Sequence, residues 1–114
     1  PPEARPVSSA EDFDRLALGF KGTVAAPHLG NTGYGVNRIY AVLVADGTTA
    51  NFKFSREEQR HLCTIARDTF TPVAGGFGKK GWTTARLDRL PEDELASALL
   101  TAWQHARLRR APKD

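Results

Sequence analysis

The sequence predicts an α+β domain with three helices and an antiparallel sheet of five strands. Apolar residues recur at helical spacing in three separated segments, near residues 10–18, after Ser55 and after Pro91. Between these segments, β-branched and aromatic residues alternate with polar ones and end at turn-forming residues. Turns this short join neighbouring strands antiparallel. The expected element order is α-β-β-β-α-β-β-α.

The length predicts one folded unit, because 114 residues supply one hydrophobic core and are too few for two. Hydrophobic residues make up 40% and charged residues 25%, which is typical of a globular chain. We expect a single domain over residues 9–110. Residues 1–8 are proline-rich and are expected to be a disordered arm or a cloning remnant, and residues 111–114 a basic tail.

The formal net charge of +3 and the pI near 9.4 are compatible with nucleic acid as a partner but do not require it. A single cysteine, Cys63, excludes an internal disulfide and suits a reducing compartment. No apolar run reaches the roughly 18 residues of a membrane span, and no leader pattern precedes the first helix. The sequence therefore predicts a cytoplasmic protein without a membrane partner.

The first helix is expected over Ala10–Leu18. Ser9 would cap it, acidic residues fill its first turn, and Gly19 would end it. Residues 21–30 contain a glycine, a proline and few apolar side chains, so they are expected to be an irregular connection or a short edge strand.

A three-stranded meander is expected over residues 32–54. Asn37 and Arg38 would form its first turn, with Arg38 at positive φ. Asp46-Gly47 would form the second turn, of type I′, because this dipeptide tolerates positive φ at both central positions. The returning strand would place Phe52 and Phe54 on one face and Asn51 and Lys53 on the other.

The second helix is expected to begin at Ser55, with Glu58 in the capping-box position. Its inward side would place Cys63 beside the core as an inert thiol. Pro91 and three acidic residues predict the start of the last helix. The inward stripe of the second helix would comprise Leu62, Ile65, Ala66 and Thr69, and the last helix would end in Arg107, Arg109, Arg110 and Lys113, which suit a helix C-terminus or a phosphate-contacting tail.

The stretch from Phe70 to Thr84 is the most distinctive part of the chain. It places four glycines, two adjacent lysines and two aromatic residues between two segments expected to be strands, over 70–73 and 82–87. Glycines let several backbone N–H groups approach one anion, lysines meet phosphates, and aromatic rings stack on bases. The composition therefore predicts a mobile cationic loop that contacts nucleic acid, although an ordinary glycine-rich connection has the same composition.

Other motifs carry no catalytic prediction. Residues 76–81 match G-x-G-x-x-G, but the segment that follows is expected to be a strand, whereas a dinucleotide site needs a helix there. The three histidines, at positions 28, 61 and 105, lie on different elements without ligand spacing. We expect no enzyme, no cofactor and no metal site.

The chain resembles the MmcQ/YjbR-like family of small bacterial proteins from about residue 9 to residue 107. The resemblance is carried by Phe70-Thr-Pro-Val, Gly-Gly-Phe-Gly and Gly-Trp-Thr, preceded by Ala50-Asn-Phe-Lys-Phe-Ser and by Ala26-Pro-His. A departure is the Asn37-Arg38 turn, where the family pattern has a glycine. The resemblance implies a two-layer fold with helices backing the sheet. It also implies DNA binding, by analogy with a double-wing arrangement, and brings no catalytic residues.

The leading hypothesis is a nucleic-acid-binding module with DNA as its ligand. The alternative is a protein-interaction or chaperone-like adaptor that uses the open sheet face or an edge strand, and a small-molecule binder is a third option. Trp82 would either stack on a base or pack beneath the last helix. The protein is expected to be a monomer or a weak dimer. The residues expected to contact nucleic acid are Lys79, Lys80, Trp82, Lys53, Arg86, Gly76 and Gly78.

Overall fold

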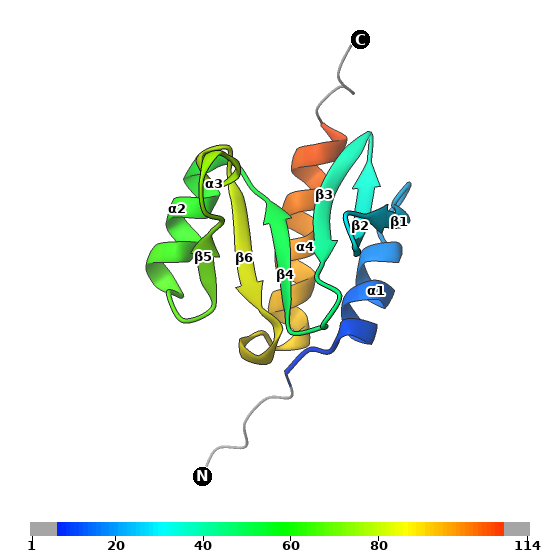
Figure 1. The fold of residues 1–114 in the computed structure, drawn as a ribbon, viewed down its shortest axis with the longest axis horizontal. Coiled ribbons are helices and arrows are strands. Elements are labelled where there is room, and N and C mark those ends of the chain that lie inside the picture. Colours follow the sequence, from blue (N-terminus) through cyan, green and yellow to red (C-terminus); the bar gives the residue numbers. More distant parts are fainter. Residues whose placement is uncertain (1–6, 109–114) are drawn as a thin grey trace.

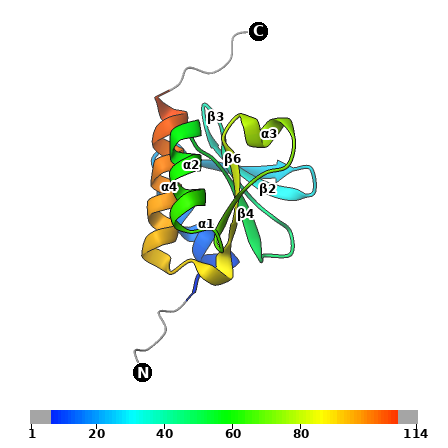
Figure 2. The same ribbon diagram turned by 90° about the vertical axis from the view of Figure 1, so that its left-hand side faces the viewer.

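A computed structural model describes residues 7–108. Six antiparallel strands form one sheet in the order β1-β2-β3-β4-β6-β5. Three long helices cover one face of this sheet, which gives the two layers (Figures 1 and 2). The elements are α1 (Ala10–Leu18), β1 (Val24–His28), β2 (Asn31–Val36), β3 (Arg38–Leu43), β4 (Thr49–Lys53), α2 (Arg56–Ile65), β5 (Phe70–Pro72), α3 (Gly76–Lys79), β6 (Trp82–Arg86), a 3₁₀ turn (Leu87–Arg89) and α4 (Glu92–Arg107).

The core lies between the sheet and the helices. Strand residues that alternate toward the helices are fully buried, as Phe52 and Ala85 show, and α1 contributes Phe13 to the same cluster. The last helix supplies the widest apolar stripe, as its spacing predicts. Its buried residues are Leu95, Ala98, Leu99, Ala102 and Ala106.

The α+β class is confirmed, but the predicted number of strands is wrong. The sheet has six strands, because residues 24–28 form β1 and pair with β2 along their whole length. This segment is the edge strand that was one of two expectations for residues 21–30. It gives little sequence signal because it lies at the sheet edge, where most of its side chains stay exposed and no apolar alternation is needed.

The helix starts follow local rules. The Ser9 hydroxyl accepts a hydrogen bond from the Asp12 backbone N–H, and the Ser9 N–H donates to the Asp12 carboxylate, which completes a capping box. The bond from the Ser9 backbone holds the pKa of Asp12 below its ordinary value. At α2 the Ser55 hydroxyl accepts from the Glu58 N–H, as expected.

The turn between β3 and β4 is not of type I′. Gly47 has φ of 75°, whereas Asp46 does not have positive φ. The Gly47 N–H donates to the carbonyl of Val44, and the Asp46 carboxylate accepts from both the backbone N–H and the hydroxyl of Thr48. The aspartate therefore closes the turn with its side chain, which makes positive φ at its own position unnecessary.

At the turn between β2 and β3, too, the residue expected to have positive φ does not have it. Asn37, not Arg38, takes the positive φ, at 65°. Asparagine tolerates this region better than arginine, so the turn avoids the predicted strain. The pairing register of β2 with β3 shifts beside it, between Tyr34 and Gly35.

The inward side of α2 also differs from the predicted stripe. Ile65 is 64% exposed, because the helix ends there and the chain turns away. Thr69 lies beyond the helix. Gln59 is instead the buried residue of α2, at 7% exposure, with Leu62 and Cys63 partly buried beside it.

The domain begins before residue 9. Ser8 is buried, and both its backbone N–H and its hydroxyl donate to the carbonyl of Leu90, while Val7 forms a bridge with Pro91. The predicted boundary after residue 8 is thus too late. The predictions for residues 1–6 and for the cations beyond Leu108 concern residues outside the described part of the chain.

Candidate nucleic-acid interface

The glycine-rich stretch contains a helical turn, where the sequence predicted a mobile loop. Gly76–Lys79 form the single helical turn α3, on the side of the sheet away from α4 (Figure 2). The N–H groups of Lys80 and Gly81 donate to the carbonyls of Phe77 and Gly78. The strands on either side are joined by a bond from the Val73 N–H to the Trp82 carbonyl. The lysines therefore project from a defined turn.

Two glycines make this turn possible through close backbone approach. A Cβ at Gly78 would lie 1.8 Å from the Val73 carbonyl oxygen, and one at Gly81 would lie 2.0 Å from the Phe54 carbonyl oxygen. Gly81 also has φ of +106°, a region that favours glycine. Gly78 is buried, so its role is to shape the turn. Gly76, by contrast, is exposed and has open space around its Cα.

Gln59 holds the turn to α2. Its side-chain amide nitrogen donates to the carbonyl of Gly78 at 2.8 Å and to the carbonyl of Trp82 at 3.0 Å. Each carbonyl also accepts a backbone N–H, from Gly81 and from Val73 respectively, so Gln59 adds a second hydrogen bond to each. Sequence reasoning missed Gln59. The signal for it was its spacing, because Gln59 lies three and four positions before Leu62 and Cys63 and so shares their inward face of α2.

Lys79 and Lys80 are both exposed on this turn, together with Phe77, whose side chain is 64% exposed. Within residues 7–108 neither lysine forms an ion pair. An aromatic face beside two available ammonium groups suits a phosphate-bearing ligand that stacks. We call Phe77, Lys79 and Lys80 the cationic tip.

Lys53 and Trp82 lie opposite each other on β4 and β6, at the base of the cationic tip. They point away from the helices, because their neighbours Phe52 and Thr83 face the core with no exposure. The alternative that Trp82 packs beneath the last helix is thus wrong. Lys53 donates to the Phe54 carbonyl at 3.4 Å, which keeps its ammonium close to Gly81.

Arg86 does not join this group. It lies at the other end of β6, roughly 13 Å along the strand from Trp82 at the usual rise per residue. Its guanidinium donates to both carboxylate oxygens of Asp88, at 3.2 and 2.9 Å. The charge of Arg86 is therefore already paired and distant from the two lysines.

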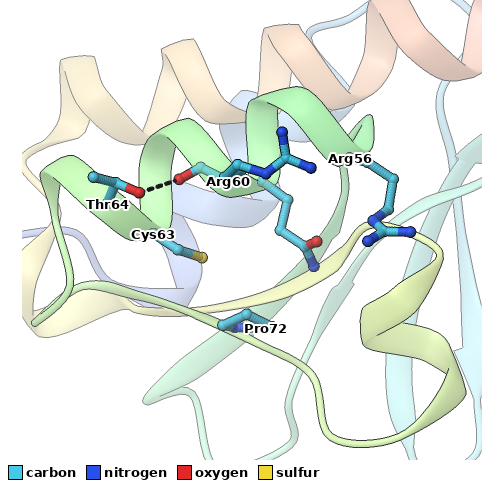
Figure 3. A pocket seen from close by; sticks show the side chains of 6 residues that line it. Arg56, Arg60, Cys63, Thr64 and Pro72 are labelled. Atoms are coloured by element: carbon cyan, nitrogen blue, oxygen red, sulfur yellow. Dashed lines mark hydrogen bonds between the residues drawn. The ribbon is translucent and has the colours of Figure 1, made fainter.

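Two arginines of α2 lie near the cationic tip instead. Arg56 and Arg60 are exposed and line a hollow of about 240 Å³ between α2 and β5. Arg56 extends toward the segment that carries α3 (Figure 3). Their spacing of four residues puts them on one helix face, a signal the sequence contained.

The remaining groups that the sequence raised as candidates are the Cys63 thiol and the imidazoles of His61 and His28. Burial raises the pKa of the Cys63 thiol, so it stays protonated and poorly nucleophilic. His61 is exposed on α2. His28 packs beside Gly33 in the β1–β2 hairpin, at the opposite edge of the sheet from β5. Among residues 7–108 no three histidine, cysteine or acidic side chains cluster as metal ligands would.

The comparisons with known proteins agree with this fold. The family model described as YjbR matches residues 18–105, which is more than half of the chain. The chain belongs to the YjbR family. The expected MmcQ/YjbR-like assignment is therefore confirmed.

A solved structure also resembles this YjbR-family chain. It is the crystal structure of the Deinococcus radiodurans protein DR2400, described with the domain DUF419. The TM-score is 0.72 at 20% identity, covering 85% of this chain and 77% of that chain. This likeness concerns the fold. No curated protein matches the chain. Over residues 7–108, no helix has both the length and the apolar character to cross a bilayer.

Proposed function

We propose that this YjbR-family protein binds nucleic acid, with DNA as its ligand, through the cationic tip and the adjoining residues Lys53 and Trp82. The observation that carries the proposal is the exposure of Phe77 and of two lysines that form no ion pair within residues 7–108, on a turn fixed by buried contacts. A fixed turn loses little conformational entropy when a ligand binds, so its charges act efficiently.

The arrangement also explains how contact would occur. Phosphates would meet Lys79 and Lys80, and displacement of counterions would provide most of the binding free energy. Phe77 offers a ring to a neighbouring base, and stacking of this kind tolerates any sequence. Arg86 is left out of the proposed contacts because it lies roughly 13 Å along β6 from Trp82, where it pairs with Asp88. The proposed activity is binding, without a chemical step.

A salt-dependent titration tests the proposal. Fluorescence anisotropy with random-sequence duplex and single-stranded oligonucleotides should show affinity that falls linearly with the logarithm of salt concentration. Absence of saturable binding at low salt to either form would rule out the proposed function.

The second candidate function, a protein-interaction adaptor, is favoured by one observation at the opposite edge of the sheet, at β1. The outer strand β1 leaves Val24 66% exposed, and Leu29 at the hairpin tip is 90% exposed. An open edge of this kind can accept a partner strand. Farther across the sheet, on β4 and β6, the open face is polar, and there the Thr84 hydroxyl donates to Asn51 at 2.6 Å. Sedimentation over a concentration series, with Val24→Lys as the comparison, would reveal pairing through this edge.

A further inference from the structure

The hollow between α2 and β5 carries a second inference. It is lined by Arg56, Gln59, Arg60, Cys63, Thr64 and Pro72 (Figure 3). Its volume of about 240 Å³ lies below the range of 300–1,000 Å³ usual for small-molecule pockets. A hollow of this size suits one unit of a larger ligand.

Arg56 and Arg60 give the rim of the hollow a double positive charge. Arg60 extends along α2 toward Arg56 (Figure 3). Over residues 7–108 neither guanidinium is in an ion pair. Like charges four residues apart on a helix repel one another, and an anion between them relieves that repulsion. Guanidinium groups match a phosphate in geometry as well as in charge.

Gln59 supplies a directed acceptor at the same place. Its amide nitrogen must face the carbonyls of Gly78 and Trp82, since only the nitrogen can donate to both. The amide oxygen Oε1 is thereby turned away from them. Among residues 7–108 no donor reaches this oxygen, and solvent does, although the residue as a whole is 7% exposed. Gln59 lines the hollow, and we infer that this oxygen, the part of the amide left without a donor among the described residues, is offered there to an N–H group.

We propose that this hollow binds one unpaired nucleotide, with its phosphate between Arg56 and Arg60 and an N–H group of its base on Gln59 Oε1. In the setting of the proposed function, on which the choice of a nucleic-acid strand rests, the nucleotide belongs to a single strand that continues to the cationic tip. The two places are directly joined, because Gln59 is bonded to Gly78, the residue before Lys79. A free nucleotide presents the same chemistry.

The proposal predicts a preference for single strands. In a duplex the N–H groups of the base edge are engaged in pairing, so a base reaches Gln59 only after its pair is broken, at an energetic cost. Duplex DNA would therefore use the cationic tip alone.

The first test measures strand binding. A short oligodeoxycytidine is titrated against the wild type, R56A/R60A and the matched control R67A/R89A, which removes two exposed arginines from another hollow. We expect R56A/R60A to lose about tenfold in single-strand affinity beyond the control, as the loss of charge-assisted bonds requires, and to match the control on duplex. An equal loss in both variants on the single strand would overturn the nucleotide site and leave the cationic tip untouched.

The second test observes the acceptor directly. In ¹⁵N-resolved NMR, 5′-dCMP should shift the Gln59 side-chain amide and the backbone amides of Cys63 and Thr64, whereas deoxyribose 5-phosphate should leave the Gln59 side chain unshifted. Equal shifts with both compounds would overturn the base contact. If dCMP shifts Gln59 while no oligonucleotide binds, the nucleotide site is supported and the proposed nucleic-acid function fails.

Discussion

The Gln59 side chain joins α2 to the cationic tip through its hydrogen bond to the Gly78 carbonyl, across 19 positions of sequence. The same nitrogen also reaches the Trp82 carbonyl at the start of β6. One buried amide therefore fixes both ends of the segment that carries the two lysines. The cationic tip is consequently positioned by the helical layer of the domain, although it lies on the opposite side of the sheet (Figure 2).

Replacement of Gln59 tests this anchoring role. Gln59→Leu should lower the free energy of unfolding by roughly 1–3 kcal/mol, because two hydrogen bonds worth about 0.5–1.5 kcal/mol each are lost. Denaturant unfolding measures this change, and hydrogen exchange should become faster at Lys80 and Gly81. Gln104→Leu, an exposed glutamine of α4, is the control and should change stability little. Unchanged exchange at the cationic tip would refute the anchor.

The glycines of the turn should differ sharply in tolerance. Gly78→Ala should destabilise the domain by at least about 3 kcal/mol. The new Cβ would lie 1.8 Å from the Val73 carbonyl oxygen, so the backbone of the turn would have to move. Gly76→Ala should be neutral or slightly stabilising, because open space surrounds it and alanine favours a helix. Thermal unfolding compares the two, and similar melting temperatures would contradict the close approach.

The lysines should dominate the salt dependence of binding to duplex DNA. K79A/K80A should weaken binding and reduce the slope of log affinity against log salt by roughly 1 to 2, as expected for two lost phosphate contacts. R67A/R89A removes the same charge at the opposite end of the β5–β6 hairpin and should change the slope less. Equal slopes for wild type and K79A/K80A would remove the cationic tip from the mechanism.

Because the pKa of Tyr34 is raised, we expect the free energy of unfolding to fall at alkaline pH. Burial and a hydrogen bond from its hydroxyl to Asp14, at 2.7 Å, raise the pKa of Tyr34 above its ordinary value. The unfolded chain ionises this tyrosine near pH 10, while the folded chain keeps it neutral, so ionisation favours unfolding as pH rises above about 10. The contribution is complete below that pH.

Urea unfolding at a series of pH values from neutral to strongly alkaline measures the effect. The wild type should lose stability steeply above pH 10, and Tyr34→Phe should lose it less steeply, since one ionisable group is gone. Burial also raises the pKa of Tyr40, so some slope should remain in that variant. Parallel curves would show that Tyr34 does not contribute to the alkaline loss.

Local chemistry explains which elements the sequence predicted. Ser9 and Ser55 mark helix starts through bonds to residues three positions later, so nearby sequence contains both partners. The alternation of Phe52 and Phe54 with Asn51 and Lys53 likewise sets the two faces of β4. The predictions at Asp46 and Arg38 were wrong for two reasons. The Asp46 side chain closes its turn by a hydrogen bond, and Asn37 takes the positive φ that was predicted for Arg38.

The candidate site was predicted only in part for a related reason. Lys79, Lys80 and Trp82 lie within four positions of one another, so the sequence alone places them close together. Arg86 is also near in sequence, yet an extended strand carries it away and Asp88 pairs with it. Arg56 and Gln59 come from another helix, and no local pattern connects them to the turn.

The sequence by itself determined the helix caps, the alternating strands and the glycine-rich segment with its two lysines, because each depends on residues a few positions apart, and its motifs carried the family resemblance. Only the tertiary structure decided that Gln59 is buried beneath α3, that Gly78 must lack a side chain and that Arg56 and Arg60 line a hollow beside the cationic tip. The position of Gln59 and the hollow depend on the docking of α2 against the β5–β6 hairpin, which is set by the complementarity of whole surfaces, and the close approach at Gly78 depends on how the hairpin itself folds back on Val73.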